Sequence, residues 1–180
     1  MSDQRTVVTQ RDVAARLVPA GVLITIHKNT FVNIKQALGG TWTVTVNGNM
    51  ARIDGTDGDA IGMEPMKFKF APAEADGSVR QADIDQVLHS VFDPEIPVNI
   101  VDLGLLYSSE VIRRDGQNVV QVRMTLTAPT CGMGPVLIGD VEYRLAMVPN
   151  VDKVEVELVF DPPWSRDMMS EEAQLELGLF

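Results

Sequence analysis

The residue best suited to chemistry is Cys131, the only cysteine in the chain, in the segment Ala-Pro-Thr-Cys-Gly-Met-Gly at 128–134. Before it, apolar and polar residues alternate over 120–127, which is typical of a half-buried strand. After it, Pro135 suits the first turn of a helix, and apolar residues continue at helical spacing. We therefore predict that the thiol lies between the end of a strand and the start of a helix. Free N–H groups and the helix dipole there favour the thiolate, which attacks electrophiles and binds soft metals.

Three uses of Cys131 follow from the residues. A buried structural cysteine is the plain alternative, but Gly132 and Gly134 let backbone amides approach the sulfur and favour a functional loop. A nucleophilic cysteine needs a histidine base, and only His27 and His89 are available, neither placed near the thiol by sequence. A closed zinc site needs about four clustered ligands, and no Cys-x-x-Cys or His-x-x-x-His pair exists. A shared or transient metal site, completed by a second subunit, a partner or a small thiol, remains open.

A second segment, at 93–107, concentrates carboxylates. Asp93, Glu95 and Asp102 lie within ten residues, and Pro94 and Pro97 predict an extended loop. Paired carboxylates can carry out acid–base work or bind a hard cation. Taken alone, this segment favours the plainer interpretation that Asp93 caps a turn and Glu95 is solvated.

Composition limits the classes of partner. The 180 residues suffice for one domain or two small ones, and 45% hydrophobic content is ample for a core. No apolar run could span a membrane, and the first residues do not resemble a secretory signal. A formal charge of −10 argues against nucleic acid, and a single cysteine allows no intramolecular disulfide. We expect a cytoplasmic protein that binds neither nucleic acid nor membrane.

The elements that position these loops can be predicted from periodicity. Over 1–70 we expect a small helix-plus-β domain, for which an open barrel is one topology. Its helix would cover 9–18, and its strands would lie at 22–26, 31–34, 42–46 and 50–53, the last two flanking the turn Asn47-Gly48. Residues 71–78 have the composition of a linker.

Over 79–180 the order of elements predicts an α+β domain. A helix capped by Ser78 precedes a hairpin around Asp115-Gly116, and the cysteine loop with its helix follows. A strand at 153–160 and a helix from Ser170 to about 177 complete the order α-β-β-α-β-α. We expect helices packed on a sheet. Trp164, after Pro162-Pro163, is expected to anchor packing, or to contact a partner if it is exposed.

Three segments taken together resemble a known family. They are Asp-Pro-Glu-Ile-Pro at 93–97 with Asp-Leu-Gly-Leu at 102–105, Met-Thr-Leu-Thr-Ala-Pro-Thr-Cys-Gly-Met-Gly at 124–134, and Phe-Asp-Pro-Pro-Trp-Ser at 160–165. In this order they resemble the metal–sulfur cluster biosynthesis family, which includes iron–sulfur assembly factors and PaaD-like proteins. The N-terminal residues, with 36–40 and 46–49, resemble the extension of its longer SufT-type bacterial members.

The resemblance implies an auxiliary, non-enzymatic role in iron–sulfur protein maturation, with an iron–sulfur cluster held transiently or shared. Cys131 takes the position of the family's cysteine and is the expected metal ligand, while Asp93, Glu95 and Asp102 take that of its acidic loop. Thr130, Gly132 and Gly134 would support the site. The expected partners are iron–sulfur scaffold or carrier proteins, client apoproteins and a second copy of the chain. A metal-free adaptor that recruits clients is the alternative, and a cysteine-dependent transferase ranks last.

Overall fold

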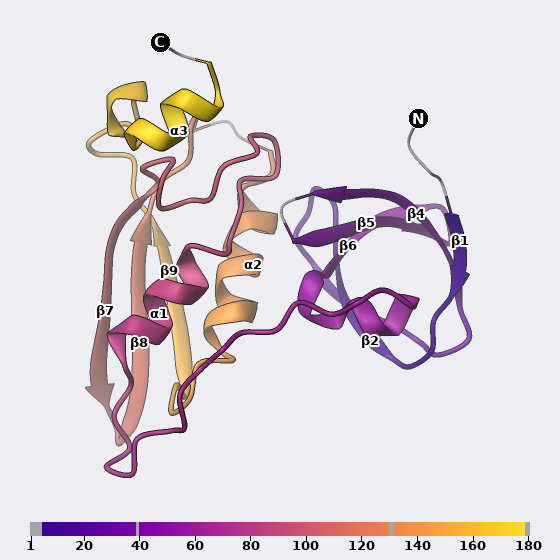
Figure 1. The fold of residues 1–180 in the computed structure, drawn as a ribbon, viewed down its shortest axis with the longest axis horizontal. Coiled ribbons are helices and arrows are strands. Elements are labelled where there is room, and N and C mark those ends of the chain that lie inside the picture. Colours follow the sequence, from indigo (N-terminus) through magenta and orange to yellow (C-terminus); the bar gives the residue numbers. More distant parts are fainter. Residues whose placement is uncertain (1–4, 39, 130–131, 179–180) are drawn as a thin grey trace. The chain divides into compact units, whose positions relative to one another are not determined.

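The computed structural model describes residues 5–38, 40–129 and 132–178 and divides the chain into two compact units. One unit comprises Met1–Lys67 and Gly132–Gly139, and the other comprises Phe68–Cys131 and Asp140–Phe180. Within the described ranges, the helices are too short or too polar to cross a bilayer. We describe each unit by itself (Figure 1).

The first unit is built on a six-stranded antiparallel sheet that curls around an apolar core (Figure 1). In spatial order its strands are β1 (Arg5–Val8), β4 (Phe31–Leu38), β5 (Thr41–Val46), β6 (Asn49–Asp54), β2 (Val13–Leu17) and β3 (Leu23–Ile26). Asn47 and Gly48 both have positive φ between β5 and β6, as expected for a tight hairpin. The four predicted strands are therefore confirmed as strands, β4 being longer than expected.

The helix expected over 9–18 is wrong, because residues 13–17 form the strand β2. Val13 and Ala15 are each only 2% exposed while Ala14 between them is partly exposed, so the strand period governs burial. β2 pairs with β3 on one side and with β6 on the other. Thr9 does not cap a helix; its hydroxyl donates to the carbonyl of His27 at 2.6 Å. Tertiary pairing has overridden the local helical pattern.

The acidic residues after β6 form a 3-10 helix, η1 (Gly55–Ile61). Asp54 caps it by accepting a hydrogen bond from the backbone N–H of Thr56 at 3.0 Å. Arg11 pairs with Asp57 at 2.9 Å and with Asp59 at 2.8 Å. The hydrogen bond from Arg11 holds the pKa of Asp59 below its ordinary value. These contacts fix η1 against the start of the sheet.

The rest of the chain is mixed α/β. Its elements are α1 (Gln81–Leu88), β7 (Leu106–Arg114), β8 (Gln117–Met124), α2 (Gly134–Leu145), β9 (Lys153–Leu158), the 3-10 helix η2 (Arg166–Met168) and α3 (Glu171–Glu176). The sheet has the order β7-β8-β9, antiparallel between β7 and β8 and parallel between β8 and β9. A parallel pair needs a crossover, and α2 lies in that connection. Ser170 caps α3 as expected, through its hydroxyl and the N–H of Ala173.

The two faces of the three-stranded sheet differ. On β8, Val120 and Val122 are buried, whereas Arg123 on the other face is exposed. The open face carries cross-strand ion pairs, such as Arg114 with Glu155 at 3.0 Å. The hydrogen bond from Arg114 lowers the pKa of Glu155 to about 2.

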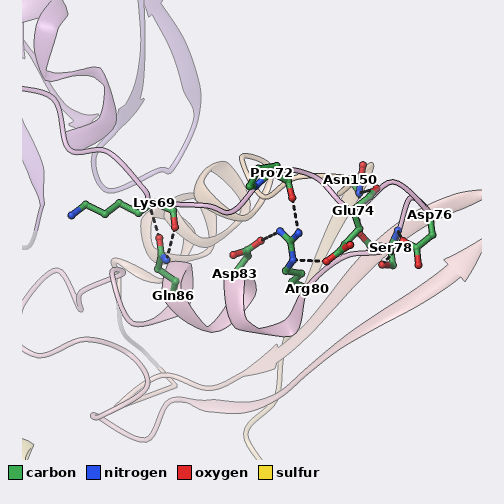
Figure 2. A network of polar contacts seen from close by, with 9 residues as sticks. All are labelled: Lys69, Pro72, Glu74, Asp76, Ser78, Arg80, Asp83, Gln86 and Asn150. Atoms are coloured by element: carbon green, nitrogen blue, oxygen red, sulfur yellow. Dashed lines mark hydrogen bonds and ion pairs between the residues drawn. The ribbon is translucent and has the colours of Figure 1, made fainter.

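The segment before α1 is held along that helix by side chains (Figure 2). The side-chain amide of Gln86 accepts from the N–H of Lys69 at 3.0 Å and donates to its carbonyl at 3.3 Å. Arg80 donates to Glu74 at 2.7 Å and to the carbonyl of Pro72 at 2.6 Å. Asn150 donates to the carbonyl of Glu74 at 3.3 Å. The segment with linker composition thus has defined contacts with the second unit, and the domain limits expected at 70 and 79 stay a prediction.

The N-terminal cap expected for α1 is wrong in detail. Arg80 occupies the cap position without a side-chain cap hydrogen bond. The hydroxyl of Ser78 donates instead to Asp76 at 2.7 Å, and that hydrogen bond lowers the pKa of Asp76. The short Asp-Gly-Ser sequence forms its own turn before the helix begins.

Candidate functional site

The acidic loop, residues 93–105, is shaped first by Asp93. This side chain is only 5% exposed, and its Oδ1 accepts hydrogen bonds from the N–H groups of Glu95 and Ile96, both at 2.9 Å. An aspartate that binds backbone N–H groups two and three residues ahead mimics a backbone turn. The prediction that Asp93 caps a turn is confirmed.

Asn99 organises the second half of the acidic loop. Its Oδ1 accepts from the N–H of Val101 at 3.0 Å and from that of Asp102 at 2.9 Å, while its Nδ2 donates to Asp102 Oδ2 at 2.7 Å. Four apolar side chains of this loop, those of Val98, Ile100, Leu103 and Leu105, are each at most 2% exposed. Asp102 is thus hydrogen-bonded within the loop rather than presented as a free carboxylate.

The strand that leads to the cysteine loop is tied directly to the acidic loop. Thr125, just after β8, donates its N–H to the carbonyl of Leu105 at 2.8 Å. Thr125 is 0% exposed, and its hydroxyl has no hydrogen-bond partner in the described chain. Beyond it the chain turns outward, since Ala128 and Pro129 are exposed. Thr130 and Cys131 lie outside the described residues.

The third motif, at 160–165, closes on the same acidic loop. The indole N–H of Trp164 donates to the carbonyl of Leu103 at 2.7 Å. The backbone N–H of Ser170 donates to the backbone carbonyl of Asp102 at 2.8 Å. Gly104, at φ 81°, packs against the backbone of Met168. A Cβ added to Gly104 would lie only 2.7 Å from the carbonyl carbon of Met168. The three sequence segments therefore meet in one place, where the C-terminal motif supports the acidic loop.

The remaining expected residues are placed as follows. Glu95 is exposed, Gly132 is exposed and Gly134 is buried at the start of α2. His89 is exposed, and its Nδ1 lies 2.7 Å from the carbonyl oxygen of Asp85, one helical turn before it. No cluster of three or more His, Cys, Asp or Glu side chains suited to a metal ion occurs among the residues that the structure describes. The ligand role of Cys131 stays a prediction.

Sequence reasoning misses the residues that assemble the site. It does not single out Asn99, although asparagine is one of the residues whose side chain favours a turn by accepting from a backbone N–H two residues ahead. The orphan hydroxyl of Thr125 has no signature in the sequence, because burial without a partner is visible only in the fold. The bond from Trp164 to Leu103 joins positions 61 residues apart, which no local pattern reports.

Comparison with known proteins places the chain among relatives. The family model described as "iron–sulfur cluster assembly protein" matches residues 81–158, which hold α1, the sheet and α2. An "Fe-S protein maturation auxiliary factor" from Porphyromonas gingivalis is 48% identical over 98 residues, covering 54% of this chain and 90% of that protein. The "Fe-S protein maturation auxiliary factor SufT" of Staphylococcus aureus is 45% identical over 89 residues, covering 49% of this chain and 98% of that protein.

Among solved structures, a domain of unknown function, DUF59, from Bacillus anthracis has a TM-score of 0.49 and 37% identity, covering 56% of this chain and 92% of that chain. The family match begins at Gln81, so the likeness of the N-terminal residues to a SufT-type extension stays a prediction. For the rest of the chain, the resemblance carried by the three segments is confirmed. With a 48% identical relative matched over 90% of its length, this chain belongs to the iron–sulfur cluster assembly protein family.

Proposed function

We propose that this protein is an auxiliary factor in the maturation of iron–sulfur proteins, and that Cys131 supplies one thiolate to a cluster in transit. The observation that carries the proposal is that the acidic loop is bonded both to the strand end that leads to the cysteine segment and to the C-terminal motif. The N–H of Thr125 and the indole of Trp164 both bind carbonyls of the acidic loop. Ala128 and Pro129, which follow Thr125, are exposed, and the sole cysteine comes two positions after Pro129 in the sequence.

The cluster is cargo in this proposal. Iron–sulfur clusters are usually held by four thiolates, and one cysteine per chain supplies only one of them. The other ligands would come from a second copy, from a scaffold or carrier protein, or from the client apoprotein. An incomplete ligand set suits transfer, because a receiving protein with more thiolates binds the cluster more tightly.

The acidic loop is proposed to position the cysteine loop rather than to bind iron. Asp93 and Asp102 already accept hydrogen bonds from their own loop, and Leu105 of that loop accepts the N–H of Thr125. A carboxylate oxygen already engaged by a backbone or side-chain N–H group is a poor additional ligand, because binding iron there would leave that N–H group unpaired. Backbone amides after Cys131, starting with Gly132, would donate hydrogen bonds to the cluster sulfurs.

A cysteine-dependent enzyme is less well supported. The only histidine of the second unit, His89, is exposed and has one ring nitrogen against a carbonyl of its own helix. A catalytic base would have to reach the thiol from a packed, oriented position. We therefore propose a non-enzymatic role, in the cytoplasm, with scaffold or carrier proteins and client apoproteins as partners.

The test is client activity in cells that lack this protein. We expect the wild-type chain to restore the activity of an iron–sulfur enzyme that is inactive in these cells, and Cys131→Ser to restore less than about a tenth of that effect at equal abundance, because a hydroxyl is a poor iron ligand. The control His89→Ala should restore activity fully. Full restoration by Cys131→Ser would favour a metal-free adaptor, and loss of activity in His89→Ala would favour a transferase.

A further inference from the structure

A cavity in the first unit is lined by none of the residues assigned to the proposed cluster site. Its volume is about 460 Å³, and its lining includes Ala37, Trp42, Gly55, Glu64, Pro65 and Met66. These residues belong to the N-terminal sheet, to the start of η1 or to the segment that follows η1, and none lies in the part matched by the family model. The cavity is therefore not explained by cluster handling.

The wall of this cavity is fixed by backbone contacts. Gly55 donates its N–H to the carbonyl of Gly40 at 2.8 Å, and its own carbonyl accepts the N–H of Met66 at 2.8 Å. A Cβ on Gly55 would collide with the carbonyl oxygen of Gly40, so only glycine permits this approach. The neighbouring Met63 donates its N–H to the carbonyl of Gly58 at 2.9 Å, which anchors the segment to η1. The cavity is thus formed before any ligand arrives.

Two side chains in the lining, Trp42 and Glu64, carry polar groups that could bind a ligand. Trp42 packs against the apolar core of the sheet while it lines the cavity. Glu64 is exposed. In the described part of the chain, neither the indole N–H of Trp42 nor the carboxylate of Glu64 has a hydrogen-bond or ion-pair partner. An aromatic ring and an unpaired carboxylate that line the same cavity form a combination that attracts an organic cation.

We propose that this cavity binds the guanidinium group of an arginine side chain presented by a partner protein. The planar guanidinium stacks on an aromatic ring and binds a carboxylate through two parallel N–H groups, which a lysine ammonium cannot reproduce. Ala37, Pro65 and Met66 provide an apolar wall for the methylene stem of such a side chain. The cavity thereby acts as a docking site whose lining residues all precede the part of the chain matched by the family model.

The chain offers a reporter for this binding, because it contains only two tryptophans. We would titrate the ¹⁵N-labelled protein with N-acetyl-arginine methylamide and follow the two indole N–H resonances. Trp42 should shift in a saturable manner with a dissociation constant in the millimolar range, as expected for one side chain. Trp164, whose indole N–H is bound to Leu103, is the internal reference and should not move.

Variants of the protein and analogues of the arginine ligand test whether the cavity recognises a guanidinium group. We expect Glu64→Gln to weaken binding at least about fivefold, since it removes the charge but keeps the shape. Glu110→Gln, which neutralises an exposed carboxylate on β7, should leave binding unchanged. The neutral citrulline analogue should not saturate the shift. The proposal would be overturned if Trp42 failed to shift up to about 50 mM ligand, if citrulline or the lysine analogue bound equally well, or if Glu64→Gln bound like the wild type.

Discussion

Replacing Gly104 by alanine is expected to destabilise the second unit by about 3 kcal/mol or more. At φ 81° a side chain is strained, and the added Cβ would also collide with the backbone carbonyl of Met168. The contact cannot be relieved by a rotamer change, because the obstacle is backbone. The loop would have to move away from the C-terminal segment, which also removes the acceptor of Trp164. Denaturant unfolding followed through the indole N–H resonance of Trp164 measures this effect in the second unit alone.

Gly116 provides a matched control for Gly104. It has φ 77° in the turn between β7 and β8, and a Cβ added there would have nothing within 4 Å. Gly116→Ala should therefore cost only the backbone strain, about 1 kcal/mol. Equal losses in the two variants would contradict the close packing of Gly104 on Met168.

Asp93 gives the second large effect. Asp93→Ala should destabilise the second unit by about 2 kcal/mol, because two backbone N–H groups in a partly buried turn lose their acceptor. Asp93→Asn keeps an acceptor oxygen at the same place and should cost less than about 1 kcal/mol. The same unfolding measurement, combined with client maturation in cells at equal protein abundance, compares the two variants.

The asparagine variant separates a positioning role from a chemical one. If Asp93 only shapes the loop, Asp93→Asn should keep most of the maturation activity, and Asp93→Ala should lose it in proportion to its instability. If Asp93→Asn folds normally but is as inactive as Asp93→Ala, the negative charge itself is needed, and the carboxylate takes part in binding metal or moving protons.

The elements found from the sequence are those fixed by local chemistry. The turns at Asn47-Gly48 and Asp115-Gly116 require positive φ, which these residues tolerate, and both flank strands in the structure. The helix α1 follows from its apolar spacing, with Ile84, Val87 and Leu88 all 0% exposed. In the site, Asp93 is correctly predicted as a turn cap because the interaction spans only three residues.

The elements that the sequence does not reveal depend on distant partners. Residues 13–17 have a helical pattern, yet they form a strand because β3 and β6 lie on either side of them. The support of the acidic loop by Trp164 and Ser170 joins residues more than sixty positions apart. The contacts of Gln86 and Asn150 with the segment before α1 are likewise long-range. Such side-chain to backbone bonds leave no periodic signal, so composition alone suggests a free linker.

The most direct test of the carrier proposal is anaerobic reconstitution with iron and sulfide, followed by the visible spectrum and by iron and sulfide per chain. Wild type, Cys131→Ser, and Cys131→Ser with Ala71→Cys would be compared, because the double variant keeps one thiol per chain at an exposed position. We predict a cluster chromophore in the wild type that is absent from both variants. An equal chromophore in Cys131→Ser or in the relocated-thiol variant, or none in the wild type, would contradict a cluster bound through Cys131.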